Sequence, residues 1–338
     1  MIVLSFAGAS IVAYDFYKKI YKPNIKLDSG QDHTFIYIPT NADFNTVLQI
    51  LSDEKLLADR ASFEWLAEIK NYKNNIKPGR YRIKKNMNNN QLINHLKAGL
   101  QEPVKFTFNN IRTKKQLIDR VSLKLEASEE DLKKILNDND YLNQNYGLNS
   151  YTIMTLFIPN TYEFYWNTSA EEFLKRMAQE YKKFWTDERK AKAKALNLSQ
   201  SEVSILASIV QAEQQLRKDE RPIIAGLYLN RLRKGMRLES DPTLIFAHGD
   251  FSIKRVYNVH KEIDSPYNTY KYAGLPPGPI LIPEINSIDA VLNAQKHNYI
   301  FMCAKEDFSG YHNFARTLDE HNINAARYIK ELNRRGIK

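Results

Sequence analysis

The stretch SQSEVSILASIVQAE, residues 199–213, has the pattern of a capped and largely apolar helix. Ser199 followed three residues later by Glu202 is a capping box, in which the hydroxyl accepts a hydrogen bond from a free backbone N–H and the carboxylate returns one. The apolar run that follows is long enough to continue the helix to Glu213. The sequence therefore predicts a helix that is mostly buried and that ends in a carboxylate.

Glu213 lies on the same side of this predicted helix as Leu206 and Val210, because successive residues rotate by about 100°. At the edge of an apolar stripe, desolvation raises the pKa of a carboxyl. A raised pKa is what a general acid requires near neutral pH. The other interpretation is a structural carboxylate paired with Arg217 one turn later. This helix alone does not separate the two.

The next segments predict a core helix and two loops. Pro222 suits a first helical turn and Gly235 a helix end, with mostly apolar residues between them. Residues 236–243 are expected to form a short strand that runs into an Asp-Pro turn. Tyrosines beside Asn and Thr at 265–270, ahead of the Pro/Gly-rich stretch 274–280, suit sugar recognition, since rings stack on pyranose faces. Surface packing is the alternative for these tyrosines.

The N-terminal half has its own pattern. Residues 34–100 follow the order strand, helix, helix, strand, helix, and Gly99 is placed to stop the last helix. With its KPGRYRI strand, this βααβ module, placed at residues 30–102, resembles a LysM-like glycan-binding domain. An ordinary small α/β spacer is the alternative. A linking subdomain with one strand and two helices is expected at 103–150. The catalytic domain is expected at 151–336.

The chain begins with an apolar run from Ile2 to Ala13. About 12 residues are fewer than the roughly 20 that span a bilayer, and no A-x-A-like cleavage site follows. We therefore expect an uncleaved membrane anchor at residues 1–21 that lacks its start, with a buried N-terminal helix as the alternative. No other run is long enough to span a membrane.

Composition limits the remaining function classes. The net charge of +10 is compatible with nucleic acid, anionic phospholipid or a carboxylate-rich wall polymer, but no nucleic-acid-binding fingerprint is present. A single cysteine, Cys303, excludes an intrachain disulfide. No Gly-rich phosphate loop and no HExxH pair occur, so neither a nucleotide nor a metal site is predicted. His312 and His321 are expected to be ordinary hydrogen-bonding histidines, although His312 with Asn313 is also a candidate for a cleft floor.

Four sequence blocks together resemble one family, the endolytic murein transglycosylases, also called MltG or YceG-like proteins. Their order and spacing agree over roughly residues 150–330. The blocks are LASIVQAE (206–213), LYLNRLRKGMRLESDPTLIF (227–246), SPYNTYKYAGLPPGPI (265–280) and HNFARTLDEH (312–321). Several blocks in order are far more specific than any one of them.

The resemblance implies a lyase that cuts MurNAc-GlcNAc bonds inside nascent glycan strands and leaves 1,6-anhydroMurNAc ends, which terminates strand elongation. The family's catalytic acid falls on Glu213, and the competing acidic position is Gln211 here. The substrate-binding residues that the resemblance and the loop composition indicate are Asp241, Thr243, Tyr267, Asn268, Thr269, Tyr270, His312 and Asn313. Asp241 precedes a proline, so a structural turn role is an equal alternative. No cofactor is implied.

Two departures from the family pattern affect subsite detail. The family's LEGFLFPDTYEF corresponds to residues 153–164 without the first Glu, and its NPG is replaced at 282–284 by Ile-Pro-Glu. Neither touches Glu213.

The sequence as a whole predicts an α+β chain: an anchor helix, the LysM-like module and a mixed α/β catalytic domain. It is expected to sit in the inner (cytoplasmic) membrane as a single-pass protein, with its catalytic domain on the outer or periplasmic side. The expected partners are peptidoglycan strands, that membrane and peptidoglycan synthases, and not nucleic acid. A lysozyme-type muramidase, which needs a second carboxylate, and a non-catalytic wall-binding scaffold are the alternatives.

Overall fold

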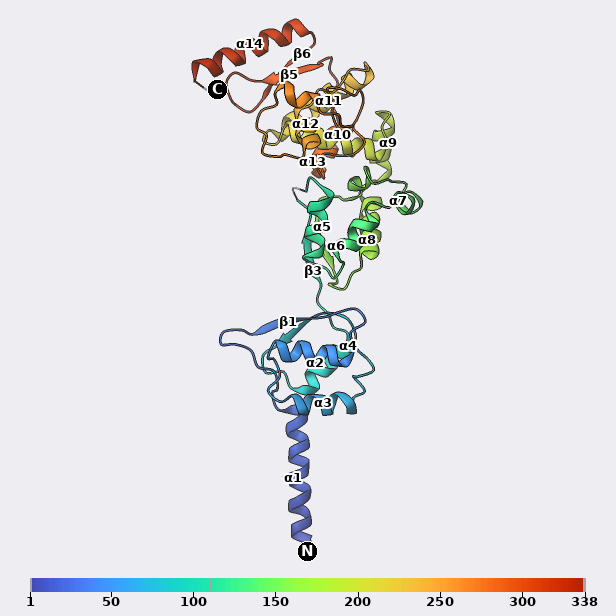
Figure 1. Ribbon diagram of the computed structural model, residues 1–338, viewed down its shortest axis with the longest axis vertical. Coiled ribbons are helices and arrows are strands. Elements are labelled where there is room, and N and C mark those ends of the chain that lie inside the picture. The colour runs from blue at the N-terminus through green and yellow to red at the C-terminus, as the bar shows by residue number, and fades with distance from the viewer. Residues whose placement is uncertain (1, 110, 337–338) are drawn as a thin grey trace. The chain divides into compact units, whose positions relative to one another are not determined.

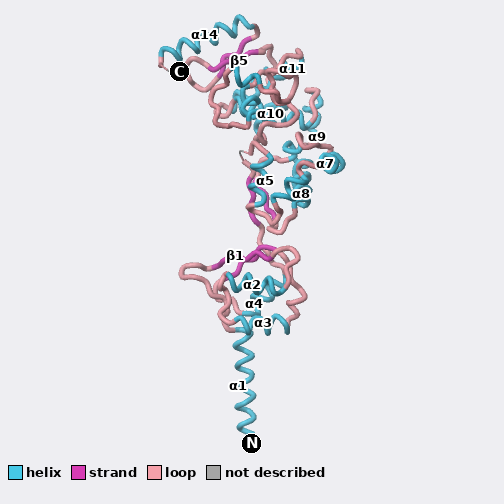
Figure 2. The backbone as a smooth tube through the Cα atoms, viewed as in Figure 1, coloured by secondary structure: helices cyan, strands magenta, loops and turns pink. Residues whose placement is uncertain are grey.

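The computed structural model describes the backbone of residues 2–109 and 111–336, with side chains from Val12 onward (Figure 1). Within these residues the chain is an α+β structure with fourteen α-helices and three two-stranded sheets. Helices and loops predominate, and the strands are short (Figure 2). Contacts divide the chain into two compact units. The first comprises residues 1–106, 120–128 and 162–170, and the second residues 107–119, 129–161 and 171–338.

The first unit is built on the antiparallel pair β1 (His33–Ile38) and β2 (Gly79–Lys84). Helices α2 (Phe44–Asp53), α3 (Arg60–Ile69) and α4 (Asn89–Ala98) supply most of the rest of its core, and Ile25, Leu56 and Tyr72 from the loops complete it. The order strand, helix, helix, strand, helix that the sequence predicts is confirmed. The likeness to a LysM domain stays a prediction.

The two faces of the β1–β2 sheet differ because successive side chains in a strand point to opposite sides. Residues on one face are buried in the core of the first unit: Ile36, Ile38, Tyr81 and Ile83. Residues on the other face are half-buried or exposed: Phe35, Tyr37, Arg80 and Arg82. In the strand register Phe35 lies opposite Arg82, and Tyr37 opposite Arg80. The outer face therefore alternates aromatic and cationic side chains.

Local caps explain why these helices begin and end where they do. Asp43 accepts a hydrogen bond of 2.7 Å from the backbone N–H of Thr46 at the start of α2. Asn88 and Gln91 form a capping box at the start of α4. Gly99 ends α4 at φ 72°, a left-handed conformation that glycine adopts without strain.

Helix α1 (Ile2–Tyr21) precedes this core. Its last turns contact the first unit, where the amide of Asn89 donates to the Lys19 carbonyl over 2.8 Å and Phe16 lies 5.4 Å from Trp65. Among the described residues, no helix combines the length and the apolar character that a bilayer crossing requires. The side chains of residues 1–11 lie outside the described residues, and the anchor at 1–21 stays a prediction.

Further elements follow along the chain. Strands β3 (Val104–Thr107) and β4 (Thr161–Phe164) pair with each other. The helices of this region are α5 (Lys114–Ser122), α6 (Glu129–Ile135), α7 (Asn139–Tyr146), α8 (Ala170–Phe184) and α9 (Asp187–Ala195), with a short 3₁₀ turn η1 (Ile153–Leu156). The strand and two helices predicted after residue 103 are confirmed as β3, α5 and α6. Their domain boundaries stay predictions.

The core of the second unit surrounds α10 (Gln200–Glu213) and α11 (Arg221–Arg233). Around them lie α12 (Asp241–His248), α13 (Ile285–Leu292), α14 (Leu318–Arg334) and the antiparallel pair β5 (Phe301–Ala304) and β6 (His312–Ala315), with the 3₁₀ turns η2 (Lys218–Glu220) and η3 (Asn258–Glu262). Gly226 allows α11 to approach the segment after α13 closely, since a Cβ there would lie 2.2 Å from the Gln295 carbonyl oxygen.

The strand predicted at residues 236–243 is wrong. The chain is irregular up to Ser240, and α12 then begins at Asp241 with Pro242 in its first turn. Proline is favoured there because its φ is already helical and its missing N–H costs no hydrogen bond. The Asp-Pro pair thus starts a helix, not a turn after a strand.

Candidate active site

Glu213 is the last residue of α10 and lines a cavity of about 470 Å³ within the second unit. The residue is half-buried as a whole, and one carboxyl oxygen, Oε1, accepts two hydroxyl hydrogen bonds. Tyr228 of α11 donates over 2.6 Å, and Ser240, just before α12, donates over 2.5 Å. The other oxygen, Oε2, has no hydrogen-bond partner among the described residues. The predicted pairing of Glu213 with Arg217 is wrong, because Arg217 donates instead to the Ser309 carbonyl.

Burial raises the pKa of Glu213, and the nearby charge of Asp241 raises it further. The hydroxyls of Ser240 and Tyr228 act the other way, but the net shift of the pKa is upward. The position at the C-terminal end of α10 also disfavours a negative charge, since the helix dipole is negative there. Glu213 therefore holds its proton at a higher pH than an ordinary glutamate does.

Ser240 is fixed by two buried threonines. Its backbone N–H donates to the Thr269 hydroxyl over 3.0 Å, and its carbonyl accepts from the Thr243 hydroxyl over 2.7 Å. The two threonine hydroxyls also bond to each other at 2.8 Å. Ser240 stands at the N-cap position of α12 and makes no capping bond, and its hydroxyl donates to Glu213. Thr243 and Thr269 therefore support the carboxyl through Ser240 and do not line the cavity.

The loop before Thr269 is folded by Asn268, which is fully buried. Its amide donates to the carbonyls of Lys261 and Ile263, and its oxygen accepts from the backbone N–H of Tyr270. Tyr267 packs on Phe246 with ring centroids 4.7 Å apart, and burial raises the pKa of Tyr267 to about 12. Asn268 and Tyr267 hold the loop that carries Tyr270, and neither of them lines the cavity.

The cavity itself is lined by side chains from α10, α11, α12, β5, β6 and α14 and from the loops between them. The residues are Glu213, Leu227, Tyr228, Arg231, Leu238, Glu239, Asp241, Tyr270, Phe301, Met302, Cys303, Ala304, His312, Leu318 and His321. The lining thus combines polar side chains with apolar and aromatic ones.

Two further carboxylates line the cavity, and both have partners. Asp241 accepts a 2.6 Å hydrogen bond from the Tyr270 hydroxyl. Glu239 pairs with the largely buried Arg231 at 3.0 Å. Glu213 differs from Glu239 because its partners are neutral hydroxyls, and from Asp241 because two hydroxyls donate to one of its oxygens.

His312 is held by a buried carboxylate. Glu220 is 3% exposed and accepts from the His312 backbone N–H over 2.8 Å, while its other oxygen lies 2.7 Å from the ring Nδ1. Burial alone would raise the pKa of Glu220, but the hydrogen bonds from His312 and Gln214 bring it below the usual value. Asn313 instead donates to Glu306 over 2.8 Å and is not among the residues lining the cavity.

Of the predicted catalytic and substrate-binding residues, the structure brings four together on the cavity: Glu213, Asp241, Tyr270 and His312. His321, expected to be an ordinary hydrogen-bonding histidine, also lines the cavity, and its buried Nδ1 has no hydrogen-bond partner among the described residues. Sequence reasoning missed Tyr228 and Ser240. Tyr228 sits inside an apolar helix, where nothing distinguishes it from a core residue. Ser240 before Asp-Pro carries an N-cap signal, which indicates a helix start and not a contact with Glu213.

The sequence profile of the YceG-like family matches residues 36–327. This chain belongs to the YceG-like family. The matched stretch includes Glu213, its two hydroxyl donors and every residue that lines the cavity. The resemblance seen in the four sequence blocks is thereby confirmed.

Curated relatives support this placement. The chain is 29% identical over 318 residues to the endolytic murein transglycosylase of Bacillus subtilis (strain 168), covering 88% of this chain and 85% of the relative. It is 24% identical over 348 residues to the endolytic murein transglycosylase of Streptococcus pneumoniae serotype 2 (strain D39 / NCTC 7466), covering 94% of this chain. The chain spans 62% of that pneumococcal protein's length.

A solved structure shares the YceG-like fold. The crystal structure of a yceG-like protein from Listeria monocytogenes has a TM-score of 0.57 and 26% sequence identity to this chain. The match covers 86% of this chain and 98% of the Listeria chain.

Proposed function

We propose that this chain is an endolytic peptidoglycan lytic transglycosylase that uses Glu213 as its general acid and then as its base. The observation that carries the proposal is the protonatable carboxyl of Glu213 in a polar cavity, held by two hydroxyl donors on one oxygen only. Family membership and relatives named as endolytic murein transglycosylases support it.

The two donors decide where the proton of Glu213 sits. Oε1 already accepts from Tyr228 and Ser240, so its lone pairs are used and the acidic proton belongs on Oε2. Oε2 gives this proton to the glycosidic oxygen between MurNAc and GlcNAc as the bond to the muramyl C1 breaks. The carboxylate left behind is stabilised by the same two hydroxyls, since hydrogen bonds to an ionised acceptor are stronger.

The second half of the reaction returns the proton. The oxocarbenium-like charge at C1 is met by the substrate's own N-acetyl carbonyl, as in substrate-assisted glycosidases. Glu213, now ionised, takes the proton from the C6 hydroxyl, whose oxygen bonds to C1 and closes the 1,6-anhydro ring. One carboxyl serves both steps, and no water is consumed.

A lysozyme-type hydrolase is the runner-up. It needs a second carboxylate that is free to direct water or to attack C1. Glu239 pairs with Arg231, and Asp241 accepts a hydrogen bond from Tyr270 on Oδ1. The names of the curated relatives favour the lyase over the hydrolase.

We propose roles for the other site residues according to where they lie. Asp241, Tyr270 and His312 would contact the sugars. Five residues would position the walls of the site without touching the reacting atoms: Thr243, Tyr267, Asn268, Thr269 and Asn313. Membrane attachment through residues 1–21, the LysM-like role of residues 30–102 and cooperation with peptidoglycan synthases stay predictions from the sequence.

The test is mass spectrometry of the products from nascent, uncross-linked glycan strands. The native chain is expected to release internal fragments with 1,6-anhydromuramyl ends, and Glu213→Gln to release none. The matched control is Glu262→Gln at the end of η3, an exposed glutamate outside the cavity, which should cleave normally. Reducing ends would make the protein a hydrolase, and intact strands that still bind would leave only a wall-binding scaffold.

A further inference from the structure

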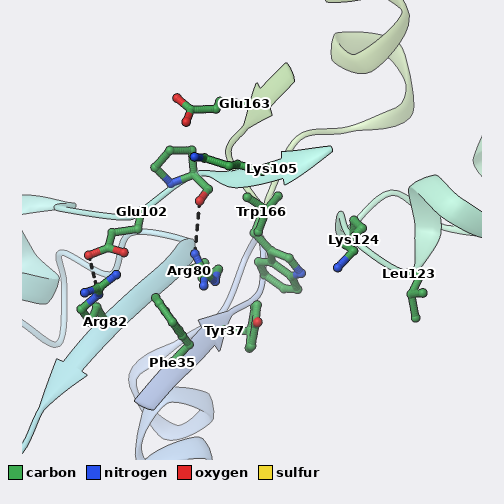
Figure 3. Close-up of a pocket in the computed structure, with 12 residues that line it drawn as sticks. Phe35, Tyr37, Arg80, Arg82, Glu102, Lys105, Leu123, Lys124, Glu163 and Trp166 are labelled. Atoms are coloured by element: carbon green, nitrogen blue, oxygen red, sulfur yellow. Dashed lines mark hydrogen bonds and ion pairs between the residues drawn. The ribbon is translucent and has the colours of Figure 1, made fainter. Parts of the chain in front are cut away.

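A second hollow lies within the first unit, on the outer face of the β1–β2 sheet. It has a volume of about 720 Å³ (Figure 3). It is lined by Phe35, Tyr37, Arg80, Arg82, Glu102, Pro103, Val104, Lys105, Leu123, Lys124, Glu163 and Trp166. We call this hollow the sheet groove. None of its residues takes part in the chemistry proposed for Glu213.

The sheet groove presents two aromatic rings to solvent. Tyr37 is 43% exposed, and its ring lies 5.2 Å from that of the half-buried Trp166, at an angle of 63°. Phe35 does not offer a free face, because the Arg80 guanidinium covers its ring at 3.3 Å. Tyr37 and Trp166 therefore form the surface on which a pyranose ring can stack.

This aromatic pair is fixed in place before any ligand arrives. The backbone N–H and the hydroxyl of Thr40, just beyond β1, donate to the two carboxylate oxygens of Glu126 over 2.6 and 2.5 Å. The backbone N–H of Glu126 donates in turn to the Trp166 carbonyl over 2.7 Å. The bonds through Glu126 tie the Trp166 loop to the end of the Tyr37 strand, and a preformed surface binds at lower entropic cost.

The charges in the sheet groove are of both signs, with cations in excess. Four basic side chains and two acidic ones line it. Arg80 donates to the Pro103 carbonyl over 3.2 Å, and Arg82 pairs with Glu102 at 2.8 Å. Lys105 and Lys124 are exposed, and neither has an ion pair among the described residues (Figure 3). These two lysines are available to carboxylates of a ligand.

We infer that the sheet groove binds a peptide-bearing stretch of a peptidoglycan strand, with sugar rings against Tyr37 and Trp166 and stem-peptide carboxylates at Lys105 and Lys124. Mixed charge favours this ligand, because a stem peptide carries carboxylates together with a free amine, for which Glu163 is an acceptor. A polyphosphate or a phosphatidylglycerol surface has no amine and would leave Glu163 without a cationic partner. The inference rests on the proposed function for the identity of the polymer.

The test uses the full chain carrying Glu213→Gln, so that strands stay intact during binding. The probes are uncross-linked strands with stem peptides, the same strands stripped of peptides, free stem peptide, and phosphatidylglycerol vesicles. Lys105→Glu with Lys124→Glu is expected to weaken binding of peptide-bearing strands by about tenfold, the effect of losing two exposed ion contacts and gaining repulsion. Stripped strands should be affected much less. Tyr37→Ala should weaken both strand forms by about threefold.

The matched control is Lys26→Glu with Lys55→Glu, the same charge change on exposed lysines of the same unit outside the sheet groove. An equal loss in this control would overturn the inference, since the effect would then come from net charge alone. So would no loss in the Lys105/Lys124 variant with an unchanged melting temperature. Loss of vesicle binding with unchanged strand binding would also overturn it and identify a lipid surface as the ligand.

The proposed function and this inference fail separately. If the chain with native Glu213 yields no 1,6-anhydro ends while the lysine variant still loses strand binding, the catalytic proposal fails and the sheet groove stands. If cleavage is normal and no groove variant changes binding, the reverse holds.

Discussion

The cavity around Glu213 and the sheet groove beside Tyr37 use polar side chains in opposite ways. In the cavity, Oε1 of Glu213 accepts two hydroxyl hydrogen bonds, Asp241 accepts one from Tyr270, and Glu239 pairs with Arg231. In the sheet groove, Lys105 and Lys124 are exposed and have no ion pair among the described residues. A carboxyl held in place by neighbouring side chains suits a chemical step, which needs a fixed acid. An open set of charges suits a ligand that slides through many positions.

The comparison predicts its largest effect at Glu213. Glu213→Gln keeps the shape but removes the transferable proton, so kcat for strand cleavage should fall by about a thousandfold or more. Strand affinity should stay within about twofold, because the groove is unchanged. Single-turnover cleavage measures the rate of the chemical step, and equilibrium binding of the same variant measures its strand affinity. A parallel loss of affinity would mean that the two sites are not separate in function.

Tyr228→Phe should have the next largest effect. It removes one donor to Oε1 and leaves the ring in place, so kcat should fall by about tenfold as the ionised acid loses a hydrogen bond. That bond lowers the pKa of Glu213, so its removal raises the pKa. The alkaline limb of the pH–rate profile, where the acid must still be protonated, should therefore move to higher pH. A downward move would show that Glu213 is not the group that titrates there.

Tyr37→Ala tests the contribution of the sheet groove. Removing the exposed ring should raise KM for long strands by about threefold without changing kcat, because Tyr37 is not among the residues that line the Glu213 cavity. Steady-state kinetics with strands of different length test it. A fall in kcat at saturating strand would place Tyr37 in the catalytic machinery.

The smallest effect concerns stability. The pKa of Glu213 is raised on folding, so burying this carboxyl costs least when it is protonated at low pH and most once it ionises above its folded pKa. Glu213→Gln should accordingly raise Tm by a few degrees at pH 8 and by almost nothing at pH 4. A change of about 1 kcal/mol in the free energy of unfolding corresponds to roughly 2–4 °C in Tm. Thermal denaturation at both pH values measures it. Equal Tm changes at the two pH values would contradict the upward shift of the Glu213 pKa.

What the sequence could predict depends on how far apart the interacting residues are. The capping box of α10 and the order of elements in the first unit are local patterns, and both are confirmed. The donors to Glu213 come from 15 and 27 residues further on, so their contact with the carboxyl follows from packing. No periodicity reveals it.

The sheet groove shows the same limit. Alternation in β1 predicts that Phe35 and Tyr37 share a face, but Trp166 reaches that face from a segment far along the chain.

The wrong strand prediction at residues 236–243 has a different cause. Pro242 is compatible with both a turn and a first helical turn, and only the surrounding core decides between them.

The order of the residues around Glu213 also has a consequence for how the protein is made. The carboxyl is synthesised before Tyr228, before Ser240 and before Thr269, which holds Ser240 in place. A chain that stops after α10 carries an ordinary glutamate, without the two hydroxyls or the enclosing residues. The surroundings that raise the pKa of this acid are therefore assembled only after the residues that line the cavity, the last of which is His321, have been added to the chain.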